Sequence, residues 1–393
     1  MNVERGDGCD RDRAVPPLRT APVTAEAPAD RDAAATLAAR LAGHDFAHVL
    51  VFAAPEADLA ALARDLAAAL PGPRITGATT AGEIGRDGYA EGTVVAMGLP
   101  RAGFATASVV IRDLARLDAD EVGRSVTAAR VGLAQAAPDH PHDAAFLLCD
   151  GLSLREDVLT AALAPGLGGV PLFGGSAGDG ARFASTRLLH DGALLEDAAV
   201  LTLMRTIHRP RVFSLDNLRP TAIRMVVTAA DADRRVVREI NAEPAAREYA
   251  RLVGLDPEQL GEFAFAAHPV VVRLGDVHHV RAIQRVNARG ELVFFSAIDE
   301  GMVLTVAEPE DVVTHTDRAL AALAEPVAPV AILGCDCILR RVAAEREQSV
   351  GRLGATLARH GLVGFSTYGE QLGPMHLNQT LTGIAFYPPG KAR

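Results

Sequence analysis

The hydrophobic and polar positions of the chain repeat one pattern three times: an apolar strand, an amphipathic helix, a second short strand and a glycine-rich turn. Apolar residues at intervals of three and four, as at Leu59, Leu62 and Leu66, indicate the helices, and short apolar runs bounded by glycine or proline indicate the strands. Three copies with the same order of elements predict an internally repeated α/β protein. The strand, helix and strand are predicted at 47–54, 56–70 and 74–77 in the first copy, at 144–149, 153–163 and 170–173 in the second, and at 330–334, 339–357 and 362–365 in the third.

The glycine-rich turns that follow the second strands resemble one another. Residues 77–83 (GATTAGE) match residues 364–370 (GFSTYGE) in both glycines, the second threonine and the glutamate, and residues 174–179 (GGSAGD) end in glycine and aspartate. In βα units, the turns after the strands line one rim of the sheet, where ligands bind. We therefore expect the two Gly-Glu turns and the Gly-Asp turn to face a shared rim.

Strand-like runs between the copies, such as 92–99, 104–111 and 198–204, predict antiparallel additions to mixed sheets. The fold class that follows is α/β, with two related α/β halves that contain repeated strand-helix-strand units and mixed sheets. The charged stretch 231–238 indicates the boundary between the halves, and the charged, proline-rich residues 1–31 indicate a disordered tail. The predicted halves are 44–230 and 236–388.

Composition and charge exclude several classes of protein. The 393 residues carry 39 Lys and Arg against 49 Asp and Glu, a net charge of −10, so the chain offers no broad basic surface to nucleic acid or to an anionic membrane. Lys391 is the only lysine, which excludes a phosphate-binding P-loop and Schiff-base chemistry. No apolar stretch reaches the roughly 18 residues that span a bilayer, no secretory signal is present, and four cysteines are too few for a disulfide scaffold, so we expect a cytoplasmic protein.

Two motifs raise the possibility of reactive side chains. Residues 174–178 (GGSAG) satisfy the nucleophile pattern of serine hydrolases and follow a strand, but a nucleophile elbow must open a helix, whereas residues 182–190 resemble a strand. A structural turn is therefore favoured over a hydrolase that uses Ser176. Cys335 and Cys337 precede a helix whose N-terminus could lower a thiol pKa and make the thiol reactive or metal-binding; two buried small side chains are the simpler interpretation.

Two histidines are candidate ligands of a cofactor. His268 lies in the apolar run 265–272, and His376 follows the last Gly-Glu turn. A neutral imidazole in an apolar pocket is what haem iron requires of a proximal ligand, and a structural histidine is the alternative interpretation at both positions.

Four separated motifs stand out at 77–85 (GATTAGEIG), 172–180 (LFGGSAGDG), 333–341 (LGCDCILRR) and 363–382 (VGFSTYGEQLGPMHLNQTLT). In this order they resemble the signatures of FIST proteins, which combine a FIST N-terminal and a FIST C-terminal domain. The resemblance covers about residues 47–387 and implies a FIST N-terminal sensory domain at 44–230 and a FIST C-terminal domain at 236–388. Two further phrases, 266–273 (AAHPVVVR) and 297–301 (AIDEG), are similar to the NosP branch of nitric oxide sensing haemoproteins.

The resemblance implies a cytosolic small-ligand sensor that is not an enzyme. In the NosP branch, haem binds nitric oxide and the partner is a histidine kinase or a cyclic-di-GMP signalling enzyme. The alternative within the family is a sensor of another small molecule, such as an amino acid, without haem. As haem contacts we expect His268, which is the first choice for the iron ligand because it lies in a phrase peculiar to the NosP branch, together with His376, Phe265 and Tyr368. As rim residues that contact a ligand we expect Gly82, Glu83, Ser176, Asp179, Gly369, Glu370 and Asn378.

Overall fold

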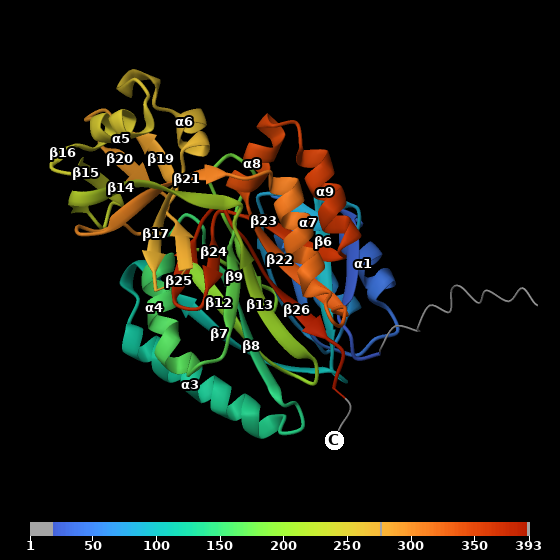
Figure 1. The fold of residues 1–393 in the computed structure, drawn as a ribbon. Coiled ribbons are helices and arrows are strands. Elements are labelled where there is room, and N and C mark those ends of the chain that lie inside the picture. The colour runs from blue at the N-terminus through green and yellow to red at the C-terminus, as the bar shows by residue number, and fades with distance from the viewer. Residues whose placement is uncertain (1–18, 276, 391–393) are drawn as a thin grey trace, which may run out of the picture.

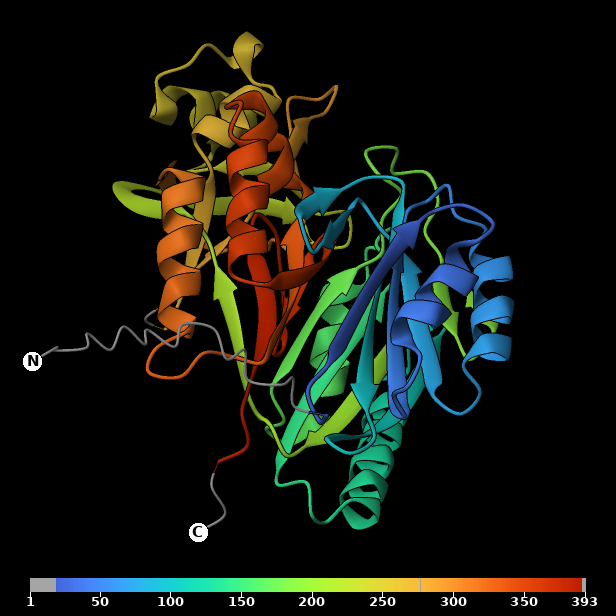
Figure 2. The same cartoon turned by 90° about the vertical axis from the view of Figure 1, so that its right-hand side faces the viewer.

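The computed structural model describes residues 19–275 and 277–390, and it confirms the mixed α/β class with repeated strand-helix-strand units (Figures 1 and 2). Each copy of the repeat builds one six-stranded mixed sheet, and the order of strands across the three sheets is the same. Across each sheet, the order is an edge strand, the last strand of the copy, its first strand, its second strand and then a two-stranded hairpin. The first sheet is β1 (Val23–Pro28), β6 (Thr93–Pro100), β2 (Phe46–Ala53), β3 (Arg74–Thr79), β10 (Leu188–His190) and β11 (Ala193–Leu195). The second is β7 (Phe104–Arg112), β12 (Ala198–Thr206), β8 (His142–Cys149), β9 (Leu172–Ser176), β24 (Glu370–Leu372) and β25 (Met375–Leu377). The third is β13 (Arg209–Leu215), β26 (Leu381–Tyr387), β22 (Ala331–Cys337), β23 (Leu362–Thr367), β4 (Glu83–Gly85) and β5 (Gly88–Ala90).

The hairpins are exchanged between the copies in a closed cycle. Hairpin β4–β5 of the first copy pairs with β23 of the third, β24–β25 of the third pairs with β9 of the second, and β10–β11 of the second pairs with β3 of the first. The first and second strands within each copy pair in parallel, as βα units require. Because every hairpin joins the sheet of another copy, each sheet is complete only with a hairpin from a neighbouring copy, and the three copies form one body.

Helices cover the outer faces of the sheets, and the inner faces share one core. Phe52, Phe146 and Phe365 come from three different copies; Phe52 stacks on Phe365 with ring centroids 4.4 Å apart and meets Phe146 edge-on at 6.2 Å. None of the helices in the described part of the chain combines the length and the apolar character needed to cross a bilayer. The first sheet is covered by α1 (Ala33–Leu41) and α2 (Leu59–Ala69), the second by α3 (Ala119–Ala136) and α4 (Glu156–Leu167), and the third by α7 (Val312–Leu323) and α9 (Val350–Arg359), with α8 (Ile338–Arg346) at its end (Figure 1).

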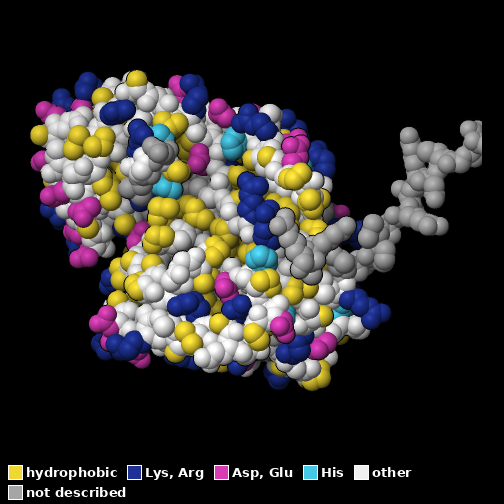
Figure 3. Space-filling model, turned by 60° about the horizontal axis from the view of Figure 1, so that its bottom comes forward, with side chains coloured by type: hydrophobic (Ala, Val, Ile, Leu, Met, Phe, Trp, Pro, Cys, Tyr) yellow, Lys and Arg dark blue, Asp and Glu magenta, His cyan; other side chains and the backbone are white. Residues whose placement is uncertain are grey.

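Residues 218–309 form a separate lobe, which is inserted between the edge strand and the first strand of the third copy (Figure 1, upper left). The lobe has its own core around Tyr249 and Phe294. The charged stretch 231–238, expected between the halves, spans the turn between two strands of this lobe. Viewed from below, hydrophobic side chains gather in the middle of the face, between the two parts of the molecule (Figure 3). The lobe consists of α5 (Ala245–Val253), α6 (Glu262–Ala267) and an eight-stranded sheet in the order β18 (Val277–Val280), β17 (Val270–Leu274), β21 (Val303–Pro309), β14 (Leu218–Asp231), β15 (Val236–Ile240), β20 (Leu292–Phe294) and β19 (Ile283–Val286), with β16 (Glu243–Pro244) paired to β15.

Three local predictions differ from the structure. Part of the expected disordered tail, residues 1–18, lies outside the described residues, but residues 23–28 form β1, because Ala25 and Ala27 pack against the first helix pair. The helix predicted at 339–357 is two helices, α8 and α9, since Gln348 between them adopts a left-handed backbone (φ 55°) that a helix cannot continue. The strand predicted over 182–190 is confined to β10.

Candidate functional site

The turns after the second strands of the three copies meet at one end of the shared core. Each turn donates one backbone N–H to the strand end of the next copy, so the three hydrogen bonds close a ring. The ring brings the two Gly-Glu turns and the Gly-Asp turn together. Its bonds run from Ala81 N–H to Ser366 O (2.9 Å), from Tyr368 N–H to Ser176 O (3.3 Å) and from Gly178 N–H to Thr79 O (3.0 Å).

Glu83 and Glu370 fix the exchanged hairpins from inside the protein. Both side chains are fully buried, and each carboxyl group accepts hydrogen bonds from a threonine three residues earlier and a threonine ten residues later. Burial raises the pKa of Glu83, and it raises the pKa of Glu370 to about 8. Hydroxyl groups of the chain itself therefore donate hydrogen bonds to both carboxyl groups. The threonines are Thr80 and Thr93 around Glu83, and Thr367 and Thr380 around Glu370.

Asp179 and Tyr368 anchor a loop at the rim, residues 180–187, which we call the Phe183 loop. The Tyr368 hydroxyl donates to the Asp179 carboxylate and accepts the backbone N–H groups of Asp179 and Phe183, both at 3.1 Å. The carboxylate also accepts two N–H groups of the loop, at 3.0 and 2.8 Å. Although burial raises the pKa of Asp179, these hydrogen bonds outweigh it and hold the pKa below its usual value. Phe183 stacks on the Tyr368 ring at 4.2 Å.

Gly82, Gly369 and Asn378 shape the turns. A Cβ on Gly369 would lie 2.2 Å from Cε1 of His376, and one on Gly82 would lie 2.3 Å from a guanidinium nitrogen of Arg341. Gly369 therefore requires glycine for close approach to the His376 ring, whereas Gly82 requires it because its φ of 135° is one that other residues rarely adopt. Asn378 is fully buried, and its amide donates to the backbone oxygen of Tyr368 at 3.2 Å.

A cavity of about 600 Å³ lies beside the Phe183 loop, between the inserted lobe and α8. Its walls are mainly apolar, with Phe183 on one side and Phe265 and Phe295 of the lobe on another. Gln379, in the turn before β26, also lines the cavity. An apolar cavity with a few polar groups is the usual form of a small-molecule site. Further lining residues are Ala181, Leu260, Gly261, Ala266, Ile283, Gln284, Arg285, Val286, Ile338, Leu339, Val342, Ala343 and Arg346.

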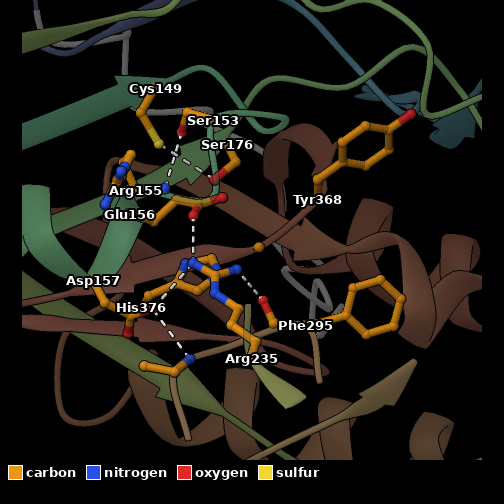
Figure 4. A network of polar contacts seen from close by, with 12 residues as sticks. Cys149, Ser153, Arg155, Glu156, Asp157, Ser176, Arg235, Phe295, Tyr368 and His376 are labelled. Atoms are coloured by element: carbon orange, nitrogen blue, oxygen red, sulfur yellow. Dashed lines mark hydrogen bonds and ion pairs between the residues drawn. The ribbon is translucent and has the colours of Figure 1, made fainter. Parts of the chain in front are cut away.

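A buried ion pair joins the inserted lobe to the second copy of the repeat. Arg235 lies in the turn between β14 and β15, and its guanidinium contacts Glu156 at 2.8 Å and Asp157 at 3.2 Å, at the start of α4. Arg235 also donates to the backbone oxygen of Phe295, which is part of the cavity wall. Figure 4 shows the guanidinium reaching these carboxylates, with His376 beside them. Arg235 therefore connects the cavity wall directly to the start of α4.

The two candidate iron ligands do not line the cavity. The His268 backbone caps α6 and its oxygen accepts the Tyr249 hydroxyl at 2.6 Å, whereas His376 is 1% exposed and packed against Gly369. Burial lowers the pKa of His376, so its imidazole is neutral. Among the described lining residues, Phe265 is an expected haem contact, but no histidine, cysteine, methionine or tyrosine is present to bind iron. The described cavity therefore does not fit haem.

The serine and cysteine side chains of the rim are buried among protein atoms. Ser176 Oγ accepts from the Gln371 amide at 2.9 Å and contacts the Cys149 thiol at 3.3 Å, and a loop rather than a helix follows. This context is that of a structural turn, not of a nucleophile elbow. Cys335 and Cys337 are fully buried, and burial raises the pKa of both thiols, which makes them unreactive.

Three residues that the sequence patterns did not identify contribute to the site: Phe183, Arg235 and Gln379. All three have a left-handed backbone, with φ of 51°, 55° and 55°. Such angles are uncommon for these residue types and carry no signal in the hydrophobic pattern. Arg235 lies in the charged stretch that we interpreted as a boundary. The hydrophobic pattern does not distinguish one buried arginine in such a stretch from solvent-exposed ones.

Comparison with known protein families assigns both parts of the chain. The FIST N domain matches residues 47–243, and the FIST C domain matches residues 245–373. No curated protein matches the chain. FIST domains are small-ligand sensor domains. The ordered rim motifs and the two domain matches agree, and the chain belongs to the FIST family.

Proposed function

We propose that this protein senses a small organic molecule, which binds in the cavity between the inserted lobe and α8, and that it has no catalytic output of its own. The observation that carries the proposal is the position of the cavity. It lies beside the Phe183 loop of the second copy, and its walls come from this loop, the lobe and α8 of the third copy. A ligand there contacts three segments far apart in sequence, so its binding favours the arrangement that places them together.

The lining favours a ligand with an apolar body and a few polar groups. Phe265, Ile338 and Leu339 supply apolar surface, while Gln379 and Arg285 supply an acceptor and a positive charge. Of the two ligand classes that the resemblance implies, an apolar amino acid matches these groups better than haem. The cavity volume, about 600 Å³, also lies within the usual range for small-molecule sites.

A thermal-shift screen with apolar amino acids tests the proposal, because a ligand that binds only the folded state raises the unfolding temperature. The matched variants are Ala266→Phe, which fills the cavity, and Ala267→Phe, which adds the same side chain at the exposed neighbouring position. We expect the shift to disappear in Ala266→Phe and to remain in Ala267→Phe. A shift that survives in Ala266→Phe would place the ligand elsewhere.

Haem-based nitric oxide sensing, with a histidine kinase or a cyclic-di-GMP enzyme as partner, is the second candidate. It is favoured by the similarity to the NosP branch and by the position of Phe265 in the cavity wall, three residues before His268. Titration with haemin tests it. The geometry leads us to expect no Soret band that depends on His268; a band that shifts with nitric oxide and is lost in His268→Ala would establish the haem candidate instead.

A further inference from the structure

Gln379 differs from the other polar residues of the cavity wall. Its side-chain oxygen is buried and has no hydrogen-bond partner within residues 19–275 and 277–390. A buried acceptor without a donor costs about 1–3 kcal/mol, and most such groups in native proteins have a partner. Asn378 and Ser366 also carry unpartnered buried oxygens, but they do not line the cavity.

The backbone of Gln379 carries a second cost. Its φ of 55° lies in the left-handed region, where glycine and asparagine are preferred and glutamine is uncommon. The flanking residues hold the turn in place, since Asn378 donates to the Tyr368 backbone and Thr380 Oγ1 donates to Glu370 at 2.7 Å. Strain that is held by its surroundings at a cavity wall is typical of functional positions.

We infer that Gln379 determines the specificity of this cavity: its side-chain oxygen, which is closed off in this structure, turns to accept a hydrogen bond from an N–H or O–H group on an otherwise apolar ligand. The inference rests on the proposed function, because it assigns the ligand to the same cavity. Ile338 and Leu339 also line the cavity, and a hydrogen bond formed among apolar side chains is electrostatically stronger than one in water. Arg285, in contrast, is exposed, so a ligand that contacts its charge competes with water.

A ligand without the donor leaves the Gln379 oxygen desolvated and unpaired. Indole and benzothiophene form a suitable pair of probes, since they share size and shape and only indole carries an N–H. The chain contains no tryptophan, so indole fluorescence reports binding without a protein background of the same kind. Benzothiophene is measured by its competition with indole. One hydrogen bond predicts a preference for indole of roughly tenfold.

The test compares Gln379→Met, which removes the acceptor at similar length, with Gln379→Glu, which keeps an acceptor. Gln284→Met is the matched control, since Gln284 lines the same cavity and has no unpartnered buried oxygen. We expect the preference for indole to fall to about onefold in Gln379→Met and to persist in the other two. The same preference in Gln379→Met as in the parent protein overturns the inference.

Ala266→Phe separates this inference from the proposed function. If both probes bind the parent protein equally and Ala266→Phe abolishes their binding, the cavity remains the site and the role of Gln379 is overturned. Binding that Ala266→Phe leaves intact overturns both. If neither probe binds, the inference about Gln379 is overturned, and the thermal shift with apolar amino acids decides the proposed function separately.

Discussion

Replacing Tyr368 with phenylalanine should release the Phe183 loop while leaving the rest of the fold in place. The substitution removes one hydroxyl, and this hydroxyl connects the third copy of the repeat to the loop of the second. It donates to Asp179 and accepts the N–H groups of Asp179 and Phe183. The phenylalanine ring still stacks on Phe183, so the apolar contact is retained.

The size of the effect follows from the hydrogen bonds lost. Two neutral N–H groups lose their acceptor and the Asp179 carboxylate loses one donor; at about 1 kcal/mol for each neutral bond and 1.5–3 kcal/mol for a bond to a charged group, the sum is roughly 3–5 kcal/mol. Asp179 keeps its two bonds to N–H groups of the loop, which lowers the net effect. We expect the free energy of loop opening to fall by about 2–4 kcal/mol, which multiplies the open population by roughly 30 to 1,000.

Limited proteolysis with trypsin measures this population. Arg182 lies in the loop and is exposed, so cleavage after Arg182 reports opening when closing is faster than cleavage. Tyr249→Phe is the matched control, since it removes a single hydrogen bond to a backbone oxygen in the inserted lobe. Equal cleavage rates after Arg182 in Tyr368→Phe and Tyr249→Phe would refute the role that we assign to the Tyr368 hydroxyl.

Three further predictions concern stability. The folded-state pKa of Glu370, about 8, exceeds the usual 4.5. The stabilising contribution of Glu370 is therefore complete below pH 4.5 and is lost as the pH rises through 8. In Glu370→Gln, the free energy of unfolding measured with urea should depend less on pH across this window. Arg235→Met leaves the buried Glu156 carboxylate and the partly exposed Asp157 carboxylate without their cation, and it should destabilise the protein by about 3–5 kcal/mol in urea unfolding. Arg64→Met, which removes the exposed Arg64–Asp65 pair, should change the stability by less than about 1 kcal/mol. Gly369→Ala should lower the unfolding temperature, because its Cβ meets His376 at a cost of about 1–3 kcal/mol. Gly351→Ala, in open space on α9, should stabilise the protein by about 0.5–1 kcal/mol. Similar unfolding temperatures for the two variants would contradict the close packing at Gly369.

The sequence could predict the repeated unit because its evidence is local. Leucines at helical spacing and apolar runs between glycines depend on the nearest elements only, and the structure contains strand, helix and strand in each copy. The exchange of hairpins could not be predicted in this way. β24 pairs with β9 of another copy, and nothing in the hydrophobic pattern of a three-residue strand specifies which distant edge it joins.

The alignment of the turns shows a second limit. By sequence, Gly178-Asp179 corresponds to Gly82-Glu83, but the ring of backbone hydrogen bonds aligns Gly178 with Ala81 and therefore Asp179 with Gly82. A shift of one residue changes the role of the carboxylate completely. Asp179 binds a loop, whereas Glu83 binds two threonines inside its own copy.

The same alignment explains why the cavity lies where it does. Gly180 occupies the position of Glu83 and Glu370, so the second copy has no buried glutamate to fix its hairpin. The Phe183 loop begins at Gly180 instead and extends toward the lobe that is inserted in the third copy. The regular parts of the repeat thus build a closed scaffold with occupied polar groups, and the cavity forms where the second and third copies depart from it. Under the proposed function, a ligand in this cavity binds between the Phe183 loop and the lobe, where its binding free energy can change the position of the lobe relative to the scaffold.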